Sequence, residues 1–210
     1  MAVASLQRFT VPLNSNQSSS TQGLLMPKLQ YRFRVSFEGF GVSTGDRVEL
    51  TKQVVSFSRP TVSFADVDVH VYNSIVRLAG KHSWGDVSTT IRDDAAGNVT
   101  RLIGEQLQKQ FDFMEQSSAA TGRDYKFITR CEMLDGGNGT GGENGPQILE
   151  TWELYGCYIK EANYQEVNYA NSDPVTIQMS IRFDNALQTP GGTGIGTFVG
   201  REIGGRNITM

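Results

Sequence analysis

The sequence is poor in the side chains from which most catalytic and metal sites are built. Its 210 residues include two histidines, His70 and His82, and two cysteines, Cys131 and Cys157. The cysteines lie far apart without Cys-x-x-Cys spacing, which favours two separate thiols over a zinc site. His70 occupies a polar position of a predicted strand and His82 a Gly-Lys-His-Ser turn, where histidines are ordinary surface residues. We therefore expect no catalytic residue, metal site or cofactor, and we predict that the protein is not an enzyme.

Long apolar runs and an excess of basic residues are also missing. No window approaches the roughly 20 apolar residues that cross a bilayer, and no charged segment followed by an apolar one opens the sequence. We expect neither a membrane span nor secretion. Lys and Arg total 19 against 22 for Asp and Glu, a net charge of -3, which excludes the basic face typical of phosphate-binding proteins. The length favours one compact domain that buries about 70% of the unfolded chain's surface.

Three short motifs suggest ligand sites, and each has a plainer interpretation. Asp93 and Asp94 offer oxygen ligands for Mg²⁺, but before a predicted helix they complement its dipole. Residues 194–200 resemble a dinucleotide loop, yet the last glycine comes one position late and no strand–helix–strand unit surrounds it. The run Tyr31-Arg32-Phe33-Arg34 could stack on single-stranded nucleic acid, whereas aromatic and arginine side chains on opposite faces of one strand favour a core face and a polar face.

Alternation of apolar and polar residues predicts strands in five stretches. They are 29–37, 47–57, 62–72, 125–133 and 175–183. The alternation is strict in 29–37 and 175–183. In 62–72 the apolar residues move from even to odd positions, which predicts a β-bulge near Ala65 and Asp66. Further extended segments bring the number of strands to about seven.

One stretch follows a helical period instead. Its apolar residues recur at steps of three and four from Val99 to Met114, so they lie on one face of an amphipathic helix. Asp94 or Asn98 can cap its start. Many strands and one helix at these spacings predict a mainly β fold, an antiparallel β-barrel or sandwich with one flanking α-helix.

Both ends of the sequence differ from its middle. Residues 1–25 are predicted to form a flexible N-terminal arm, 26–186 the β-barrel domain, and 187–210 a Gly-rich C-terminal arm. The few apolar residues of the arms are expected to pack only when copies of the chain assemble. These candidate inter-subunit residues are Leu6, Phe9, Val11, Phe198 and Ile203.

Ordered segments across the domain carry a resemblance to a known family. They are MPKLQYRF (26–33), LAGKHSWGDV (78–87), WELYGCY (152–158), YANS (169–172) and TIQMSIRFD (176–184). In this order they resemble the tail tube protein family of contractile bacteriophages and related contractile injection systems. The resemblance covers roughly residues 26–186 and rests on the order of the segments, because no single one of them is diagnostic.

The resemblance implies a structural virion protein whose barrels form hexameric rings. The rings would stack into the inner tube of a contractile phage tail, a conduit for DNA ejection, after assembly in the host bacterial cytoplasm. The implied partners are copies of the same chain, tail sheath and baseplate proteins, and phage DNA that passes through the lumen without specific binding. An acidic chain suits such a conduit, because a basic wall would retain the passing phosphates.

Residues 52–78 resemble the family's inter-subunit hairpin and are our candidate for contact between rings. The positions expected to be exposed there are Ser58, Arg59, Pro60, Tyr72 and Asn73. Two other functions remain open. One is a ring that initiates or terminates the tube at the baseplate or neck. The other is an OB-like module that binds single-stranded nucleic acid.

Overall fold

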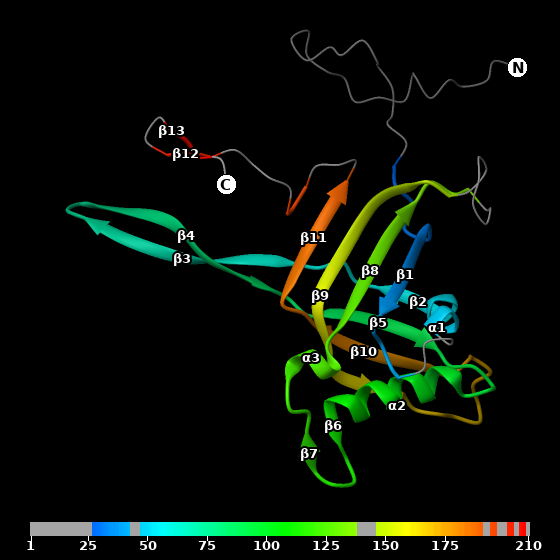
Figure 1. Ribbon diagram of the computed structural model, residues 1–210. Coiled ribbons are helices and arrows are strands. Elements are labelled where there is room, and N and C mark those ends of the chain that lie inside the picture. The colour runs from blue at the N-terminus through cyan, green and yellow to red at the C-terminus, as the bar shows by residue number, and fades with distance from the viewer. Residues whose placement is uncertain are drawn as a thin grey trace, which may run out of the picture. The chain divides into compact units, whose positions relative to one another are not determined.

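The computed structural model describes residues 27–42, 47–137, 146–190, 194–196, 201–203 and 206–208. Its elements in chain order (Figure 1) are β1 (Phe33–Glu38), α1 (Arg47–Gln53), β2 (Val54–Phe57), β3 (Val62–Val71), β4 (Ser74–Trp84), β5 (Val87–Arg92), α2 (Asn98–Gln110), β6 (Phe111–Asp112), β7 (Ser117–Ser118), α3 (Gly122–Tyr125), β8 (Phe127–Leu134), β9 (Ile148–Asn163), β10 (Thr176–Arg182), β11 (Asn185–Pro190), β12 (Arg201–Ile203) and β13 (Arg206–Ile208). The expected mainly antiparallel β fold with one long helix is confirmed.

Contacts along the chain separate two units, 1–32 and 33–210. In the described part of the first unit, the Arg32 N–H donates to the Leu29 carbonyl at 3.2 Å, and the Arg32 guanidinium lies 5.4 Å from the centre of the Tyr31 ring. All elements named above belong to the second unit, which contains every surface considered below.

A seven-stranded antiparallel sheet forms the body of the second unit. Its strand order is β1-β8-β9-β10-β5-β2, and β11 also pairs with β9. The long β9 connects the two halves of the sheet, because its first part pairs with β8 and β11 and its last part with β10. Gly156 lies between these parts with φ +69°, a backbone conformation that favours glycine. Figure 1 shows the two halves crossing.

The core packs between the two halves of the sheet and α2. Leu154 on β9 and Met179 on β10 have no exposed surface, and neither does Phe40 after β1. The rings of Phe40 and Phe127 meet edge to face, with centroids 4.9 Å apart. An edge-to-face pair adds about 0.5–1.5 kcal/mol beyond the area that it buries. One hydrophobic core therefore connects the strands and the helix.

The helix α2 begins where the sequence predicts, but it ends at Gln110 instead of continuing to Met114. Polar side chains before its start and on its buried face bind backbone groups. The Val99 N–H donates to Oδ1 of Asp94 at 3.0 Å, and this bond is the main cause that lowers the pKa of Asp94. Gln106, fully buried, accepts from the Gly41 N–H at 3.0 Å and donates to the Tyr125 carbonyl at 2.7 Å. The polar residues of α2 thus position neighbouring loops.

Two predicted strands differ from the structure. Residues 47–57 form α1 followed by the short β2, so the prediction of one continuous strand there is wrong. Leu50 is fully buried while Val48 is 61% exposed, whereas residues two positions apart in a strand share a face. The first strand begins at Phe33, later than the expected residue 29, and β11 was not predicted.

Candidate assembly surface

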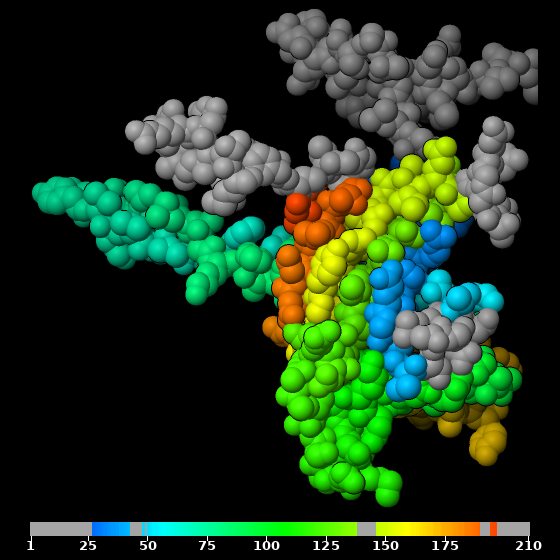
Figure 2. Space-filling model, in the orientation of Figure 1, coloured from blue at the N-terminus to red at the C-terminus, as the bar shows by residue number. Residues whose placement is uncertain are grey.

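A long hairpin, β3 and β4, extends from the sheet and pairs only with itself among the described strands. Its register runs from Val62 opposite Trp84 to Val71 opposite Ser74. All ten residues of β3 are exposed, and Figures 1 and 2 show the hairpin projecting away from the sheet. The register shifts between Phe64 and Asp66, where the bulge was predicted, but the extra residue lies in β4, because Lys81 and Gly80 there face Ala65 alone.

The hairpin ends in a two-residue turn made by Tyr72 and Asn73. Tyr72 has φ 42°, a positive value of the kind that two-residue hairpin turns require. Its side chain is fully exposed. The turn therefore presents an aromatic ring at the tip of the hairpin, and Figure 1 shows this tip far from the sheet.

The apolar side chains of the hairpin have no cover from the described chain. Val69 is 41% exposed and Leu78 52%. The other exposed apolar residues of the hairpin are Val62, Phe64, Val67, Val71, Tyr72, Ile75 and Val76. Burying one such side chain completely is worth about 1.5–3 kcal/mol, and an isolated two-stranded hairpin is marginally stable in water. The hairpin therefore has the composition of a surface that another molecule covers.

Aromatic contacts attach the root of the hairpin to the body. The Trp84 ring lies 5.6 Å from the Phe183 ring beside β10, measured between centroids. His82 lies 6.2 Å from Trp84 and 6.4 Å from Phe64. The first part of the hairpin is thus held in place, while the outer part pairs only with itself among the described strands.

The candidate residues of segment 52–78 fall at both ends of this hairpin. Tyr72 and Asn73 form its exposed tip, as expected. Ser58, Arg59 and Pro60 lie at its root, between β2 and β3, and of these Arg59 is exposed while Ser58 and Pro60 are half-buried.

Ser58 is occupied by contacts within its own chain. Its N–H donates to the Ser88 carbonyl at 2.9 Å, and its Oγ accepts from the Ser88 N–H at 2.8 Å. Ser58 and Pro60 are thus half-buried and not exposed as expected, whereas Arg59, Tyr72 and Asn73 are exposed. Leu6, Phe9, Val11 and Phe198 lie outside the described residues, and Ile203 belongs to β12 without a described side chain.

The exposed valines and leucine of the hairpin were not among the candidate residues. Alternation of valines in 62–72 predicts a strand with an apolar face, but it does not show that no part of the same domain covers that face. The phase change at Ala65 and Asp66 was the available signal, since a strand packed on one core has no reason to change its apolar face.

A second surface of the body is polar and held by ion pairs. Arg130 on β8 bridges Glu38 on β1 and Glu153 on β9, each at 2.9 Å. Arg34 lies 2.6 Å from Glu132. The Tyr155 hydroxyl donates to Glu153, and this bond, followed by Arg130, lowers the pKa of that carboxyl. Opposite charges on neighbouring strands therefore neutralise one another across this face of the sheet.

The described residues show little of the chemistry that a catalytic site needs. Among them, no cluster of three metal-ligating side chains occurs, and no helix has the length and apolar character of a membrane span. Cys131 and Cys157 are buried and free. Burial raises the pKa of the Cys131 thiol to about 12 and that of Cys157 to about 11, so both thiols stay protonated in neutral solution.

Comparison of structures finds similar proteins where comparison of sequences finds none. No protein-family model and no curated protein matches the chain. The tube-terminating cap of the anti-feeding prophage is similar to it at 10% identity and TM-score 0.56, over 80% of this chain and 95% of that one. A chain of the PVC sheath–tube complex, an extracellular contractile injection system, is similar at 12% identity and TM-score 0.55, over 78% and 92%.

The chain has a tail-tube fold. A chain of the PVC sheath/tube terminator is also similar, at 11% identity and TM-score 0.56, over 79% of this chain and 99% of that one. Because the alignments span nearly the whole of these structures, the likeness concerns the architecture of a complete tube-type domain. The fold class expected from the sequence is the one that the structures share.

Proposed function

We propose that the chain forms rings, hexameric as the sequence resemblance implies, that stack into the inner tube of a contractile phage tail. The observation that carries this proposal is the uncovered β3–β4 hairpin. Its exposed apolar residues, Val69 and Leu78 among them, have a use only if another molecule buries them. In a protein built to polymerise, the natural partner is a copy of the same chain.

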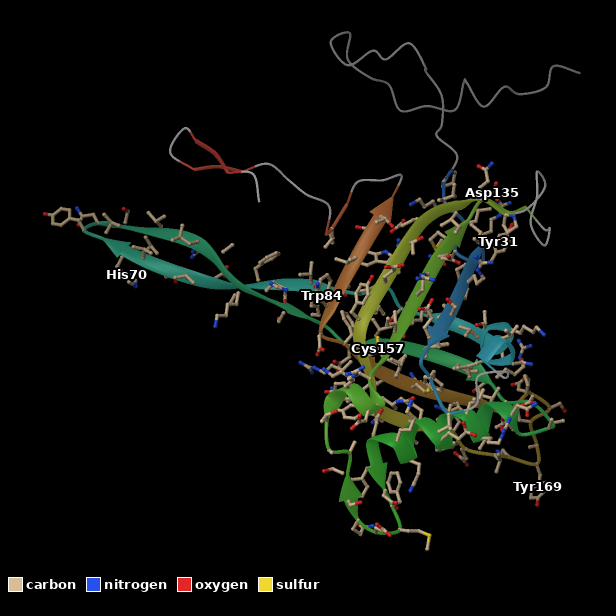
Figure 3. The ribbon with its side chains drawn as sticks, viewed as in Figure 1. Tyr31, His70, Trp84, Asp135, Cys157 and Tyr169 are labelled. Carbon is tan, nitrogen blue, oxygen red and sulfur yellow. The ribbon has the colours of Figure 1, made fainter. Side chains whose placement is uncertain are left out.

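A second group of exposed residues supports association of like copies. The segment 164–175 between β9 and β10 exposes Tyr164, Val167, Tyr169 and Val175. Figure 3 places Tyr169 and His70 of the hairpin on opposite sides of the sheet. A hairpin on one side and an apolar segment on the other suit a head-to-tail contact, which closes into a ring or continues as a filament.

The polar face of β1, β8 and β9 suits the wall of a conduit. It has Arg34 and Arg130 together with three glutamates, and these charges are paired with one another. A wall without free basic side chains would let phage DNA pass without holding its phosphates through counterion release. In this proposal the DNA is a passing cargo, and tail sheath and baseplate proteins bind elsewhere on the tube.

A ring that ends or starts the tube is the second candidate function. Two of the similar structures are a tube-terminating cap and a sheath/tube terminator, so the same fold serves at an end of a tube. A terminating ring would form single rings and no long filaments. The repeating subunit would form tubes whose length increases with protein concentration.

Negative-stain electron microscopy of the purified chain, across a concentration series, tests the proposal. Tubes or stacked rings with a central hole are expected for the repeating subunit, and single rings for a terminator. Monomers at every concentration would contradict both functions. Binding of a single-stranded oligonucleotide that weakens steeply with salt would favour the OB-like alternative instead.

A further inference from the structure

The apolar residues of the hairpin change from one face of the ribbon to the other along its length. Near the root, Phe64 lies opposite His82 on the face that Trp84 shares. Beyond the bulge, Val69 lies opposite Val76 on the other face. The outer apolar set consists of Val67, Val69, Val71, Val76 and Leu78.

The polar residues change faces in the opposite sense. Near the root, the hydroxyls of Ser63 and Ser83 meet at 2.8 Å, on the face that Val69 occupies farther out. In the outer part, Arg77 and Asp68 form an ion pair of 3.7 Å, on the face that Phe64 occupies near the root. The apolar and the polar residues thus change faces at the same place, the bulge where the strand register shifts.

The ribbon itself turns over at about the same place. In Figure 1, β3 and β4 cross between the root and the tip, so the strand that is upper near the sheet becomes lower farther out. Where the two strands exchange places in the view, the ribbon shows its other face. The change of apolar face and this turning over of the ribbon act in opposite senses, so the apolar residues of both parts come to the same side.

Gly80 allows the two strands to approach each other at the bulge. A Cβ at this position would lie 2.9 Å from the Ala65 carbonyl oxygen and 3.0 Å from Cγ2 of Val67. Any larger residue would push the strands apart where the register shifts. The local sequence thus supports the geometry that keeps the apolar residues on one side.

We propose that the hairpin is a one-sided strap: it lies on a second copy of the chain through one continuous apolar side and leaves its polar side uncovered. The apolar side joins Val62 and Phe64 near the root to Val67, Val69, Val71, Val76 and Leu78 in the outer part. Trp84 shares the root face but already packs on Phe183 of its own chain. The polar side has Ser63, Ser83 and Lys81 near the root, and Asp66, Asp68, His70 and Arg77 farther out, with Ile75 as its apolar exception.

A second copy is the occupant that the rest of the molecule favours. The strap rests on the proposed ring assembly, in which the hairpin of one copy reaches the next. Charged side chains on the polar side make it a poor surface to bury, which argues against a hairpin inserted between two neighbours. The exposed apolar segment that holds Tyr169 lies on the opposite side of the sheet, where a neighbouring strap can contact it.

Four aspartate substitutions test the strap, because the proposed apolar side includes Phe64 and Val69, which lie on opposite faces of the strand β3. Phe64→Asp and Val69→Asp place a charge on the apolar side and are expected to lower the assembled fraction at least about tenfold, since a buried unpaired charge costs several kcal/mol. Ser63→Asp and His70→Asp place the same charge on the polar side and are expected to change assembly less than about twofold. Size-exclusion chromatography with light scattering measures the assembled fraction.

The pattern of the four results separates the strap from other arrangements. In a flat ribbon with one buried face, Phe64 and His70 would behave alike, as would Ser63 and Val69, and that result would overturn the proposal. Equal loss from all four would show a hairpin buried on both sides and would also overturn it. A parent chain that stays monomeric would contradict the proposed function itself, a different outcome from these two.

Thiol labelling gives a second readout that does not depend on loss of assembly. Cysteines introduced at positions 63, 64, 69 and 70 are expected to react equally in dissociated protein. In assembled protein, positions 64 and 69 should be protected and 63 and 70 should stay reactive. The buried native Cys131 and Cys157 give little background. Equal reactivity of all four positions in the assembly would overturn the strap.

Discussion

The side-chain amide of Gln110 hydrogen-bonds both backbone groups of Ile159. Its Nε2 donates to the Ile159 carbonyl at 2.9 Å, and its Oε1 accepts from the Ile159 N–H at 2.8 Å. The last residue of α2 thus acts on β9 as a neighbouring strand would. This bond pair attaches the helix to the strand that connects both halves of the sheet.

We expect Gln110→Ala to lower the free energy of unfolding by about 1–3 kcal/mol, because two buried backbone groups lose their partner. Gln110→Glu keeps the acceptor and loses the donor, so its cost should come from the Ile159 carbonyl. The matched control is Gln108→Ala, at an exposed position of the same helix, with a change within about 0.5 kcal/mol. Urea unfolding measures all three, and equal stability of the Gln110→Ala and Gln108→Ala variants would contradict the role of this contact.

Gly156 is expected to be intolerant of any side chain. A Cβ there would lie 2.2 Å from Oδ2 of Asp184. Gly97 has nearly the same φ, +70°, but a Cβ on Gly97 would have no atom within 4 Å. Gly97→Ala should therefore cost only the backbone strain, about 1–2 kcal/mol, and Gly156→Ala a further 1–3 kcal/mol, roughly, from overpacking. Thermal unfolding of both variants checks the difference, and equal melting temperatures would show that Asp184 moves aside freely.

The sequence predicts the elements whose pattern is local and strict. The helix α2 and the strand β10 follow from the spacing of Leu102 and Ile103 or of Ile177 and Met179, all of them buried. The strand expected over 47–57 is wrong because Val48 and Leu50 imitate alternation, although tertiary contacts bury Leu50 alone. Propensity is a weak guide where packing decides.

The assembly surface is harder to predict from the sequence than the strands and the helix are, for a physical reason. Valines at alternate positions, such as Val67 and Val69, predict an apolar face but not the molecule that covers it. The tip residues Tyr72 and Asn73 can be found because a turn interrupts the strand pattern. β11 escapes prediction because Asn185–Pro190 contains few strand-forming residues, and its pairing with β9 depends on contacts distant in the sequence.

The buried thiols should make stability fall in alkaline solution. Burial raises the pKa of Cys131 from 9.0 to about 12 and that of Cys157 from 9.0 to about 11. Their stabilising effect is complete below pH 9.0 and is lost as the pH rises above it, because the unfolded thiols ionise there and the folded ones do not. Each thiol should remove about 1.4 kcal/mol per pH unit above that point.

Denaturant unfolding between pH 7.5 and 10.5 measures this slope. The control is the Cys131→Ala/Cys157→Ala variant, which is less stable at pH 7.5 because it loses buried volume. It should nevertheless lose stability more slowly above pH 9 than the parent does, because it lacks the two thiols. Every tyrosine and lysine is the same in both proteins, so their titration does not contribute to the difference. Parallel pH profiles of parent and variant would show that the thiols do not contribute.

Gly80→Ala should weaken assembly through the hairpin without lowering the stability of the body of the protein. Its Cβ would meet the Ala65 carbonyl oxygen at 2.9 Å, so the strands must move apart at the bulge and the outer apolar residues lose their alignment with those at the root. The hairpin adds little to the core, and the melting temperature of the body should therefore change little. Assembly, measured by sedimentation velocity, should weaken about tenfold or more, as expected when close packing at an interface is lost.

The matched control is Gly104→Ala, in α2 with open space around its Cβ. It should stabilise the body by up to about 1 kcal/mol and leave assembly unchanged. Normal assembly of Gly80→Ala would mean that the hairpin binds its neighbour without this bulge geometry.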